Sequence, residues 1–286
     1  MNTYYDRIME YKGADELKEI VKQWEILSEN LSKRPFDAPI VLPDLFMYTS
    51  PGYGNTNLLS LISDYLDSKK NLMSFYGDVK FFEFKLDYAS EEREFRDLYR
   101  LIDAINAAAG FRSEYKGIIR ISIDDWVGHH NEKHFLDFLQ FLQINTDYWF
   151  VVLTVSDKKA GDEAKAMEAV VRMYLRIETV TLYMPKDAEL VEFAETYLSK
   201  YDLKFDDSAR ELLEKSVAVL KENEYFNGLR TIIDLCNDIV YTVYSASTNV
   251  SHVISADMLA DFRPDGDYIT RTVLKSKKTV TLGFKL

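Results

Sequence analysis

The chain has 286 residues, of which 47% are hydrophobic and 29% charged, as is typical of a globular protein with one large or two smaller cores. Its formal net charge of -12 argues against a nucleic-acid partner, because an acidic surface repels phosphates. The single cysteine excludes an intramolecular disulfide, and without a signal peptide or an apolar run that could span a bilayer we expect a cytoplasmic protein with no membrane partner.

The first half of the chain alternates between helical and strand patterns. Apolar residues spaced three and four apart predict helices at residues 14–32, 57–66, 91–109, 135–142 and 164–175. Short apolar runs predict strands at residues 45–48, 79–84, 118–125, 149–155 and 179–183. Strands that alternate with helices are typical of a parallel sheet covered on both faces. We therefore predict an α/β domain over residues 1–185, built on a P-loop-type parallel sheet with flanking helices.

The pattern becomes helical after Pro185. Apolar spacing predicts helices at residues 188–201, 207–222 and 228–244. The pair Asp206-Asp207 supplies an N-cap for the second of these helices. We expect a small all-α domain over residues 186–260. In the tail that follows, residues 261–286, two segments alternate like strands, at 270–273 and 279–282.

Residues 49–56, Thr-Ser-Pro-Gly-Tyr-Gly-Asn-Thr, lie between a predicted strand and a predicted helix, as a phosphate-binding loop does. In such a loop glycines let backbone N–H groups approach a phosphate, a lysine pairs with the β- and γ-phosphates, and a Ser or Thr holds Mg²⁺. Here Asn55 stands at the lysine position and Thr49 at the first glycine position. The residues expected to bind a nucleotide are Pro51, Gly52, Tyr53, Gly54, Asn55, Thr56 and Asn57.

The missing lysine weakens the expected site. Losing a charge-assisted hydrogen bond to a phosphate costs about 1.5–3 kcal/mol, which is about one to two decades in affinity. Asn55 keeps a neutral donor, so we expect weak binding and no efficient hydrolysis. The alternative is that these residues form only a tight turn between strand and helix.

Two acids, Asp124 and Asp125, end the predicted strand 118–125. Ligands bind at the carboxyl edge of open α/β sheets. There Asp124, together with Thr56, would hold Mg²⁺, and Asp125 would orient or activate the attacking water. The alternative is that the two acids only end a strand and cap the next segment.

The order of these motifs resembles that of the AAA+ ATPases, and the resemblance extends from about residue 11 to residue 284. Residues 11–18 look like the family's opening segment, which helps to hold adenine. The resemblance implies ATP or ADP with Mg²⁺ as the cofactor, and a helical lid over residues 186–260. Residues 253–259 and 281–284 look like the rubisco-activase or sporulation stage V type. This chain departs from the family pattern at Asn55, at Thr49, and at Asp125, where the family has glutamate.

The same resemblance assigns roles to two arginines. Arg176 is similar to the arginine finger that reaches a neighbouring subunit, and Arg230 is similar to the sensor-2 arginine that contacts the γ-phosphate of its own subunit. The sensor-1 position falls at Ser156 or Asp157. Without the resemblance, Arg172 and Arg176 are simply cations at a solvated helix end, and Arg230 is a surface residue.

Three histidines, His129, His130 and His134, match no metal-ligand spacing, and we expect them to be exposed to solvent. Trp126 is expected to be a packing residue. We expect Cys236, within an apolar helical stretch, to be an inert core residue.

Three functions remain open. We favour a degenerate AAA+-like protein, a pseudo-ATPase that binds adenine nucleotide weakly and serves as a regulatory or non-catalytic member of a homo-oligomer or of an assembly with an active AAA+ partner. The second is a nucleotide-free scaffold or protein-binding module. The third is an active ATPase in which another cation replaces the loop lysine, the candidates being Lys12, Lys158 and Lys159.

Overall fold

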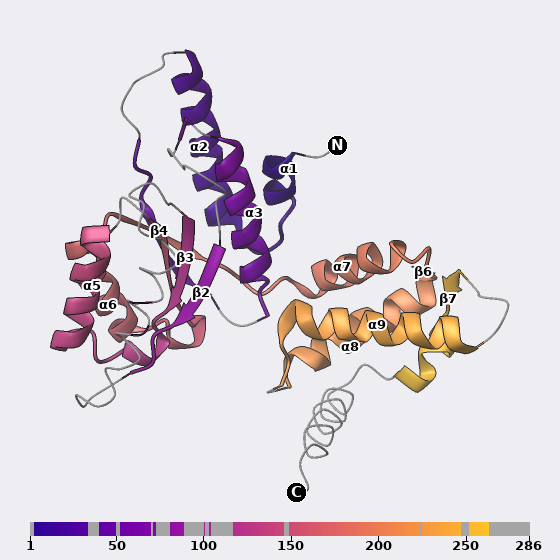
Figure 1. Ribbon diagram of the computed structural model, residues 1–286. Helices are drawn as coiled ribbons and strands as arrows, with labels where there is room; N and C mark the ends of the chain where they lie inside the picture. Colours follow the sequence, from indigo (N-terminus) through magenta and orange to yellow (C-terminus); the bar gives the residue numbers. More distant parts are fainter. Residues whose placement is uncertain are drawn as a thin grey trace, which may run out of the picture. The chain divides into compact units, whose positions relative to one another are not determined.

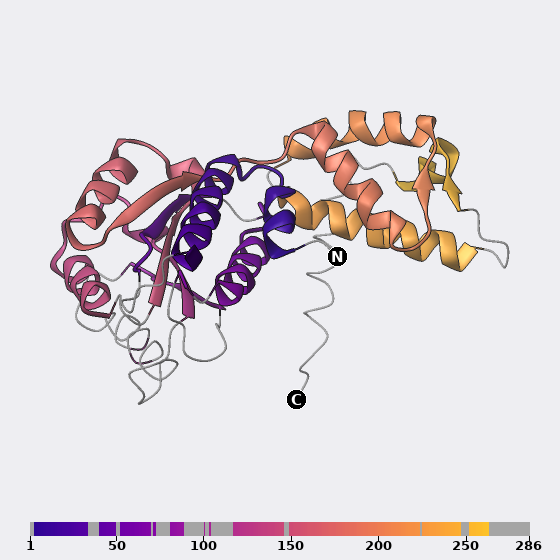
Figure 2. The same ribbon diagram turned by 90° about the horizontal axis from the view of Figure 1, so that it is seen from above.

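The computed structural model describes residues 3–33, 40–49, 52–69, 71–72, 81–88, 100, 103, 117–145, 149–223, 225–246 and 252–262. The chain forms two compact units (Figures 1 and 2). We call Met1–Ser50 with Asn55–Tyr183 the sheet unit, and Pro51–Gly54 with Met184–Leu286 the helical unit. No helix among the residues described is both long and apolar enough to cross a membrane.

The sheet unit is built on a five-stranded parallel sheet. Its strands are β1 (Asp44–Tyr48), β2 (Phe81–Lys85), β3 (Gly117–Ser122), β4 (Trp149–Val155) and β5 (Ile177–Thr181). They lie in the order β2-β3-β4-β1-β5, and every neighbouring pair is parallel. Because all strands run the same way, the residues that follow β1, β2, β3 and β4 meet at one edge. This carboxyl edge carries Thr49, which follows β1 at the start of the predicted loop, and the acid pair, which follows β3.

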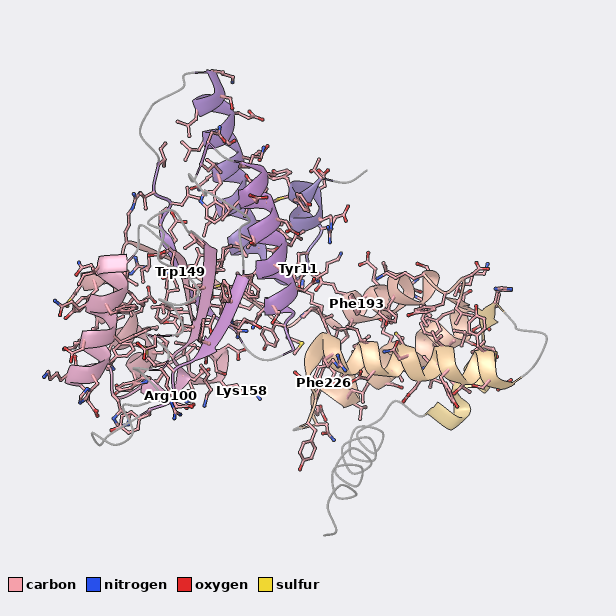
Figure 3. The ribbon with its side chains drawn as sticks, in the orientation of Figure 1. Tyr11, Arg100, Trp149, Lys158, Phe193 and Phe226 are labelled. Atoms are coloured by element: carbon pink, nitrogen blue, oxygen red, sulfur yellow. The ribbon has the colours of Figure 1, made fainter. Side chains whose placement is uncertain are left out.

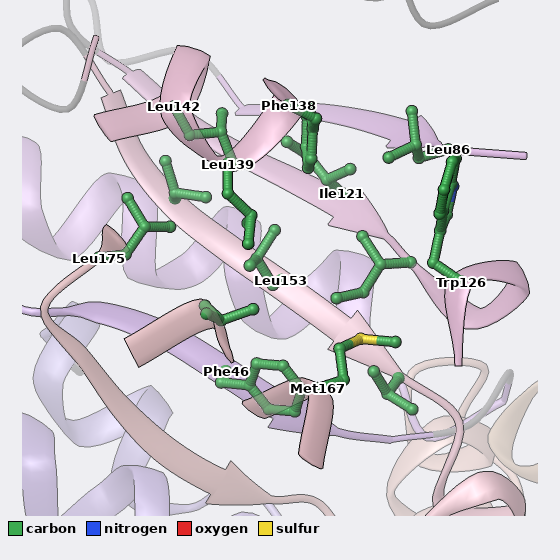
Figure 4. Packing of buried hydrophobic residues seen from close by; sticks show 14 of the residues in the cluster. Phe46, Leu86, Ile121, Trp126, Phe138, Leu139, Leu142, Leu153, Met167 and Leu175 are labelled. Carbon is green, nitrogen blue, oxygen red and sulfur yellow. The ribbon is translucent and has the colours of Figure 1, made fainter. Parts of the chain in front are cut away.

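Helices cover both faces of this sheet, as Figure 2 shows. Those of the sheet unit are α1 (Tyr4–Met9), α2 (Asp15–Lys33), α3 (Asn55–Ser68), α5 (Lys133–Asn145) and α6 (Asp162–Tyr174). Helices α5 and α6 pack on one face over a core that includes Phe46, Ile121, Phe138, Leu153 and Met167 (Figure 4). Helices α2 and α3 lie against the other face (Figure 1). The predicted fold class, a parallel α/β sheet with flanking helices, is confirmed.

The helical unit contains α7 (Asp187–Ser199), α8 (Asp207–Lys221) and α9 (Gly228–Ala246), which surround their own hydrophobic core. The predicted N-cap is Asp206, whose side chain accepts a hydrogen bond of 2.8 Å from the backbone N–H of Ala209. One feature is missing from the prediction of an all-α unit. The two-residue strands β6 (Lys204–Phe205) and β7 (Val253–Ile254) pair in parallel.

Most predicted elements appear within two residues of their expected ends. Strand β5 begins at Ile177, two residues before the prediction, because it pairs with β1 from Asp44 onward. The predicted strand 118–125 stops at Ser122, and the acids lie in a 3-10 turn, η1 (Asp124–Trp126). Of the predicted helix 91–109, only two positions, 100 and 103, are described, and both are helical. The predicted tail strands, at 270–273 and 279–282, lie outside the described residues.

Candidate functional site

The predicted phosphate loop has the backbone that its glycines allow. Gly52 and Gly54 have φ angles of 88° and 82°, in the left-handed region where a side chain is strained. Within the helical unit the carbonyl of Gly52 accepts a hydrogen bond of 2.9 Å from the N–H of Leu229. A Cβ atom on Gly52 would lie 2.3 Å from the carbonyl oxygen of Asn227, so only glycine fits. Pro51 lies outside the described residues.

The start of α9 is fitted to this loop in the same way. Gly228 has a φ of 51°, and a Cβ atom there would lie 2.4 Å from the carbonyl oxygen of Gly52. Arg230, two residues further along, is 68% exposed, and its Nε lies 3.2 Å from Oδ1 of Asp234. Within the helical unit, the backbone of the loop therefore packs directly against the first turn of α9. Arg230 is exposed on this turn.

Asn55, at the lysine position, is the first residue of α3 and is 6% exposed. Its Oδ1 accepts a hydrogen bond of 2.7 Å from Oγ1 of Thr49, which is also buried. Two of the three residues that depart from the family pattern, Asn55 and Thr49, are therefore hydrogen-bonded to each other. Asn55 joins the start of α3 to the residue that follows β1 and supplies no positive charge.

Asn57 contacts the predicted opening segment. Its side chain is hydrogen-bonded to Tyr11, whose pKa burial raises to about 12. Figure 3 shows Tyr11 beside α3, the helix that carries Asn57. Burial thus keeps the Tyr11 hydroxyl neutral, and the hydrogen bond with Asn57 acts on its pKa in the opposite direction.

Asp124 joins the ends of two strands. Its Oδ1 accepts a hydrogen bond of 2.5 Å from the backbone N–H of Ser156, which follows β4, and its Oδ2 accepts one of 2.9 Å from Oγ of Ser122. Its backbone carbonyl accepts a hydrogen bond of 2.7 Å from Nζ of Lys159. Ser156, one of the two sensor-1 positions, is thus in direct contact with the acid pair.

Asp125 is held by a lysine that the sequence analysis missed. Its Oδ2 accepts a hydrogen bond of 2.7 Å from Nζ of Lys85, and its Oδ1 lies 4.0 Å from Nζ of Lys159. Hydrogen bonds to Asp125 and Asp87 raise the pKa of Lys85. The sequence did hold a sign of this role, since Lys85 directly follows the predicted strand 79–84 and a polar residue there lies at the carboxyl edge of the sheet.

Thr56 is also engaged. Its hydroxyl donates a hydrogen bond of 2.9 Å to Oε1 of Glu83, and Nη1 of Arg120 donates one of 2.6 Å to the same oxygen. The register of β2 and β3 sets Glu83 opposite Arg120. The threonine hydroxyl is therefore directed to β2 rather than to the acid pair.

The oxygens of Thr56, Asp124 and Asp125 do not fit Mg²⁺, which takes an octahedral shell of oxygen ligands and dehydrates reluctantly. The two oxygens of Asp124 already accept protein donors, and both oxygens of Asp125 lie near an ammonium group. Across the described ranges no group of three or more His, Cys, Asp or Glu side chains is arranged to hold a metal ion.

Within the sheet unit, Arg176 lies at the edge of the sheet opposite to the acid pair. Arg176 directly precedes β5, and its carbonyl accepts a hydrogen bond of 2.9 Å from the N–H of Asp44, the first residue of β1. It is exposed and lies at the amino edge of the sheet, opposite to the edge where β1 leads into the loop. Arg172 is structural, since it donates to Glu168 and to the carbonyl of Ile177.

Other expectations are met in part. His130 is buried, so the prediction that it is exposed is wrong. The side chain of His129 is partly exposed. Its ring stacks on Tyr88, and its Nδ1 lies 2.8 Å from Oε1 of Glu132. Trp126 is buried in the core, as expected. Cys236 is buried as well, and burial raises its pKa to about 12, which makes the thiol inert at neutral pH.

Among the cation candidates of the active-ATPase alternative, Lys158 and Lys159 both lie in η2 (Asp157–Lys159), the turn that follows β4 at the carboxyl edge (Figure 3). Lys159 contacts the acid pair, as described above. Lys158 is exposed to solvent.

Comparison with solved structures identifies the fold. The RuvB Holliday junction branch migration motor of Thermotoga maritima matches 98% of this chain and 82% of its own, with a TM-score of 0.51 and 15% identity. A mutant of the same RuvB gives a TM-score of 0.55, 16% identity and coverages of 98% and 81%. PCH-2 of C. elegans matches 94% of this chain and 73% of its own, with a TM-score of 0.53 and 14% identity. No protein-family model and no curated protein matches the chain. At these identities the comparisons show the fold alone, and the chain has the fold of the AAA+ ATPases.

Proposed function

We propose that this chain is a degenerate AAA+-like protein that binds adenine nucleotide weakly, hydrolyses it little or not at all, and acts as a regulatory or non-catalytic member of an assembly. The observation that carries the proposal is the state of Asn55. The loop keeps its two left-handed glycines, while the residue at the lysine position is buried and bonded to Thr49.

Binding without the lysine relies on the backbone. Residues 55–57 form the first turn of α3, and the first turn of a helix attracts phosphate through its unpaired N–H groups and its dipole. The lost ammonium contact costs about 1.5–3 kcal/mol. We therefore expect dissociation constants in the micromolar to submillimolar range.

Hydrolysis needs a carboxylate that is free to orient or activate the attacking water. Asp125 is one methylene shorter than the usual glutamate, and its carboxylate is paired with Lys85 at 2.7 Å. Its Oδ2 accepts the hydrogen bond from that ammonium group and is therefore not free to orient a water molecule. This pairing supports little or no turnover.

The position of Arg176 supports a role in an oligomer. It is exposed at the sheet edge opposite to the one where β1 leads into the loop, so it would act on the nucleotide of a neighbouring subunit and not on its own. We propose as partner either a second copy of this chain or an active AAA+ protein. Arg230 would act as the sensor of the chain's own nucleotide site, and the helical unit would be the lid. We also propose that the protein is cytoplasmic.

We also propose that the chain is of the rubisco-activase or sporulation stage V type. Residues 253–259, one of the two segments similar to the rubisco-activase or sporulation stage V type, lie in β7 and in the 3-10 helix η3 (Ala256–Phe262). The other segment, 281–284, lies outside the described residues.

A phosphate-release assay on the full chain at millimolar ATP tests the catalytic part of the proposal. We expect the parent chain and the variant Asp125→Asn to release phosphate at the same background rate, since Asp125 is not acting as a base. Turnover that rises above background in the parent and is lost in Asp125→Asn and in Arg230→Ala would establish the active-ATPase alternative.

A second candidate function is a nucleotide-free binding module. The helical unit exposes Tyr241, with 76% of its surface accessible, together with Tyr244 on the same helix. Tyrosines that combine an apolar ring with a polar tip are common in protein interfaces. This candidate predicts no nucleotide binding under any condition.

A further inference from the structure

Two lysines flank the acid pair of the sheet unit. Lys85 ends β2 and Lys159 lies in η2 after β4, and β2 and β4 are the neighbours of β3 on either side. Nζ of Lys85 lies 2.7 Å from Oδ2 of Asp125, and Nζ of Lys159 lies 2.7 Å from the carbonyl oxygen of Asp124 and 4.0 Å from Oδ1 of Asp125. The acids are thus compensated from both sides by cations of the chain itself.

A divalent ion at this edge would meet these ammonium groups. Coulomb repulsion between a divalent and a monovalent cation is twice that between two unit charges at the same distance. The hydroxyl of Thr56, the other predicted ligand, donates to Glu83. Hydrogen bonds to Asp125 and Asp87 raise the pKa of Lys85, which keeps its ammonium charged across the neutral range.

We infer that Lys85 and Lys159 take the place of Mg²⁺ as the counter-charge of the acid pair, so that the binding of adenine nucleotide does not require a metal ion. Phosphates near two uncompensated carboxylates would be repelled, and the two ammonium groups remove that repulsion without a metal. This inference rests on the proposed nucleotide binding and specifies which residues make the metal ion dispensable.

The test is a fluorescence titration of the full chain with an N-methylanthraniloyl derivative of ATP, in excess EDTA and in excess MgCl₂. We expect dissociation constants that agree within about twofold. In Lys85→Met we expect binding in EDTA to weaken by about tenfold and MgCl₂ to restore it, because the acid is then open to the metal. Lys85→Arg keeps the cation and should bind as the parent does in both buffers.

The matched control is Lys133→Met, which removes the same charge from an exposed position at the start of α5. It should bind as the parent does in both buffers. Circular dichroism checks that each variant is folded, and if Lys85→Met does not fold, Lys159→Met serves in its place with the same expectation.

The outcomes separate this inference from the proposed function. Binding of the parent only in MgCl₂ would overturn the inference and leave weak nucleotide binding intact. Binding of both methionine variants in EDTA with the parent's affinity would show that the lysines are not the counter-charge. No binding in either buffer would overturn the proposed function, and the inference with it.

Discussion

At the scale of single residues, Asn55 separates this chain from a working phosphate loop. Its side chain is used inside the protein, where Oδ1 accepts a hydrogen bond of 2.7 Å from Thr49. A lysine at this position would instead reach outward with a charged group. The residue therefore contributes to the fold of the loop and little to the charge of the site.

Restoring the lysine should restore affinity. We predict that Asn55→Lys tightens ATP binding by about one to two decades, because an ammonium–phosphate hydrogen bond contributes about 1.5–3 kcal/mol. The same change removes the contact with Thr49, and it should lower the free energy of unfolding by about 1 kcal/mol. Calorimetry and urea denaturation measure the two effects. Asn55→Gln, which adds no charge, is the control, and a lysine variant that binds ATP no better than this control would contradict the role given to position 55.

Asp44 gives the stability of the protein a pH dependence. Burial raises its pKa from 3.8 to about 7, although its hydrogen bond with the N–H of Val151, 2.8 Å long, acts in the opposite direction. Between these two values the folded state binds a proton that the unfolded state releases. The free energy of unfolding therefore falls as pH rises through this range, by at most about 1.4 kcal/mol per pH unit.

Replacing this acid should remove that dependence. We predict that Asp44→Asn becomes steadily more stable relative to the parent between about pH 5 and pH 7, because the amide cannot ionise and keeps the acceptor for Val151. Urea denaturation across this range measures the difference. Asp64→Asn, at an exposed position of α3, is the control and should track the parent. Parallel pH profiles for Asp44→Asn and the parent would contradict the assignment.

Some residues of the candidate site could be predicted and others could not. Gly52, Gly54 and the acid pair follow from local patterns, since a left-handed turn needs glycine and a strand end exposes its acids. Lys85 could not be paired with Asp125 in advance, because the two lie on neighbouring strands whose order the sequence does not state. The burial of His130 was missed because the burial of one polar residue in a loop depends on tertiary packing, which local patterns do not show.

At the scale of elements, the loop and α9 are joined through backbone contacts of Gly52 and Gly228. We predict that Gly228→Ala lowers the free energy of unfolding by about 2 kcal/mol, because its Cβ would lie 2.4 Å from the carbonyl oxygen of Gly52 at a positive φ. Thermal denaturation measures the change. Gly161→Ala is the control, since its nearest neighbouring atom is 4.0 Å away, and it should stay within about 0.5 kcal/mol of the parent. Equal stability of the two variants would show that the loop does not need this contact.

Long periodic elements could be predicted and short ones could not. The helices over 14–32 and 228–244 and the strand 149–155 were found because their apolar spacing extends over several turns or alternations. The pair β6 and β7 has two residues in each strand, too few to show any period. The strand predicted at 118–125 was too long, because periodicity does not show where a strand turns into a 3-10 helix.

At the scale of the whole molecule, each unit has its own hydrophobic core. The three tryptophans, Trp24, Trp126 and Trp149, all belong to the sheet unit. Tryptophan fluorescence therefore reports the unfolding of the sheet unit, whereas far-ultraviolet circular dichroism reports both units. The two probes can separate the units without cutting the chain.

Core substitutions should then act on one unit at a time. Leu153→Ala, in the sheet unit, should lower the midpoint of the fluorescence transition, since burying this leucine stabilises its core by about 2–5 kcal/mol. Leu235→Ala, in the helical unit, should move part of the circular dichroism transition and leave the fluorescence midpoint unchanged. Equal shifts of both probes in both variants would show that the two units unfold as one.

The central claim, weak nucleotide binding by an AAA+-like fold whose loop lacks its lysine, is tested most directly by calorimetric titration of the full chain with ATP. We predict saturable binding with a dissociation constant in the micromolar to submillimolar range, consistent with the loss of about 1.5–3 kcal/mol from a complete site. The absence of any binding heat at millimolar ATP would contradict the claim and leave the protein-binding module as the function to pursue.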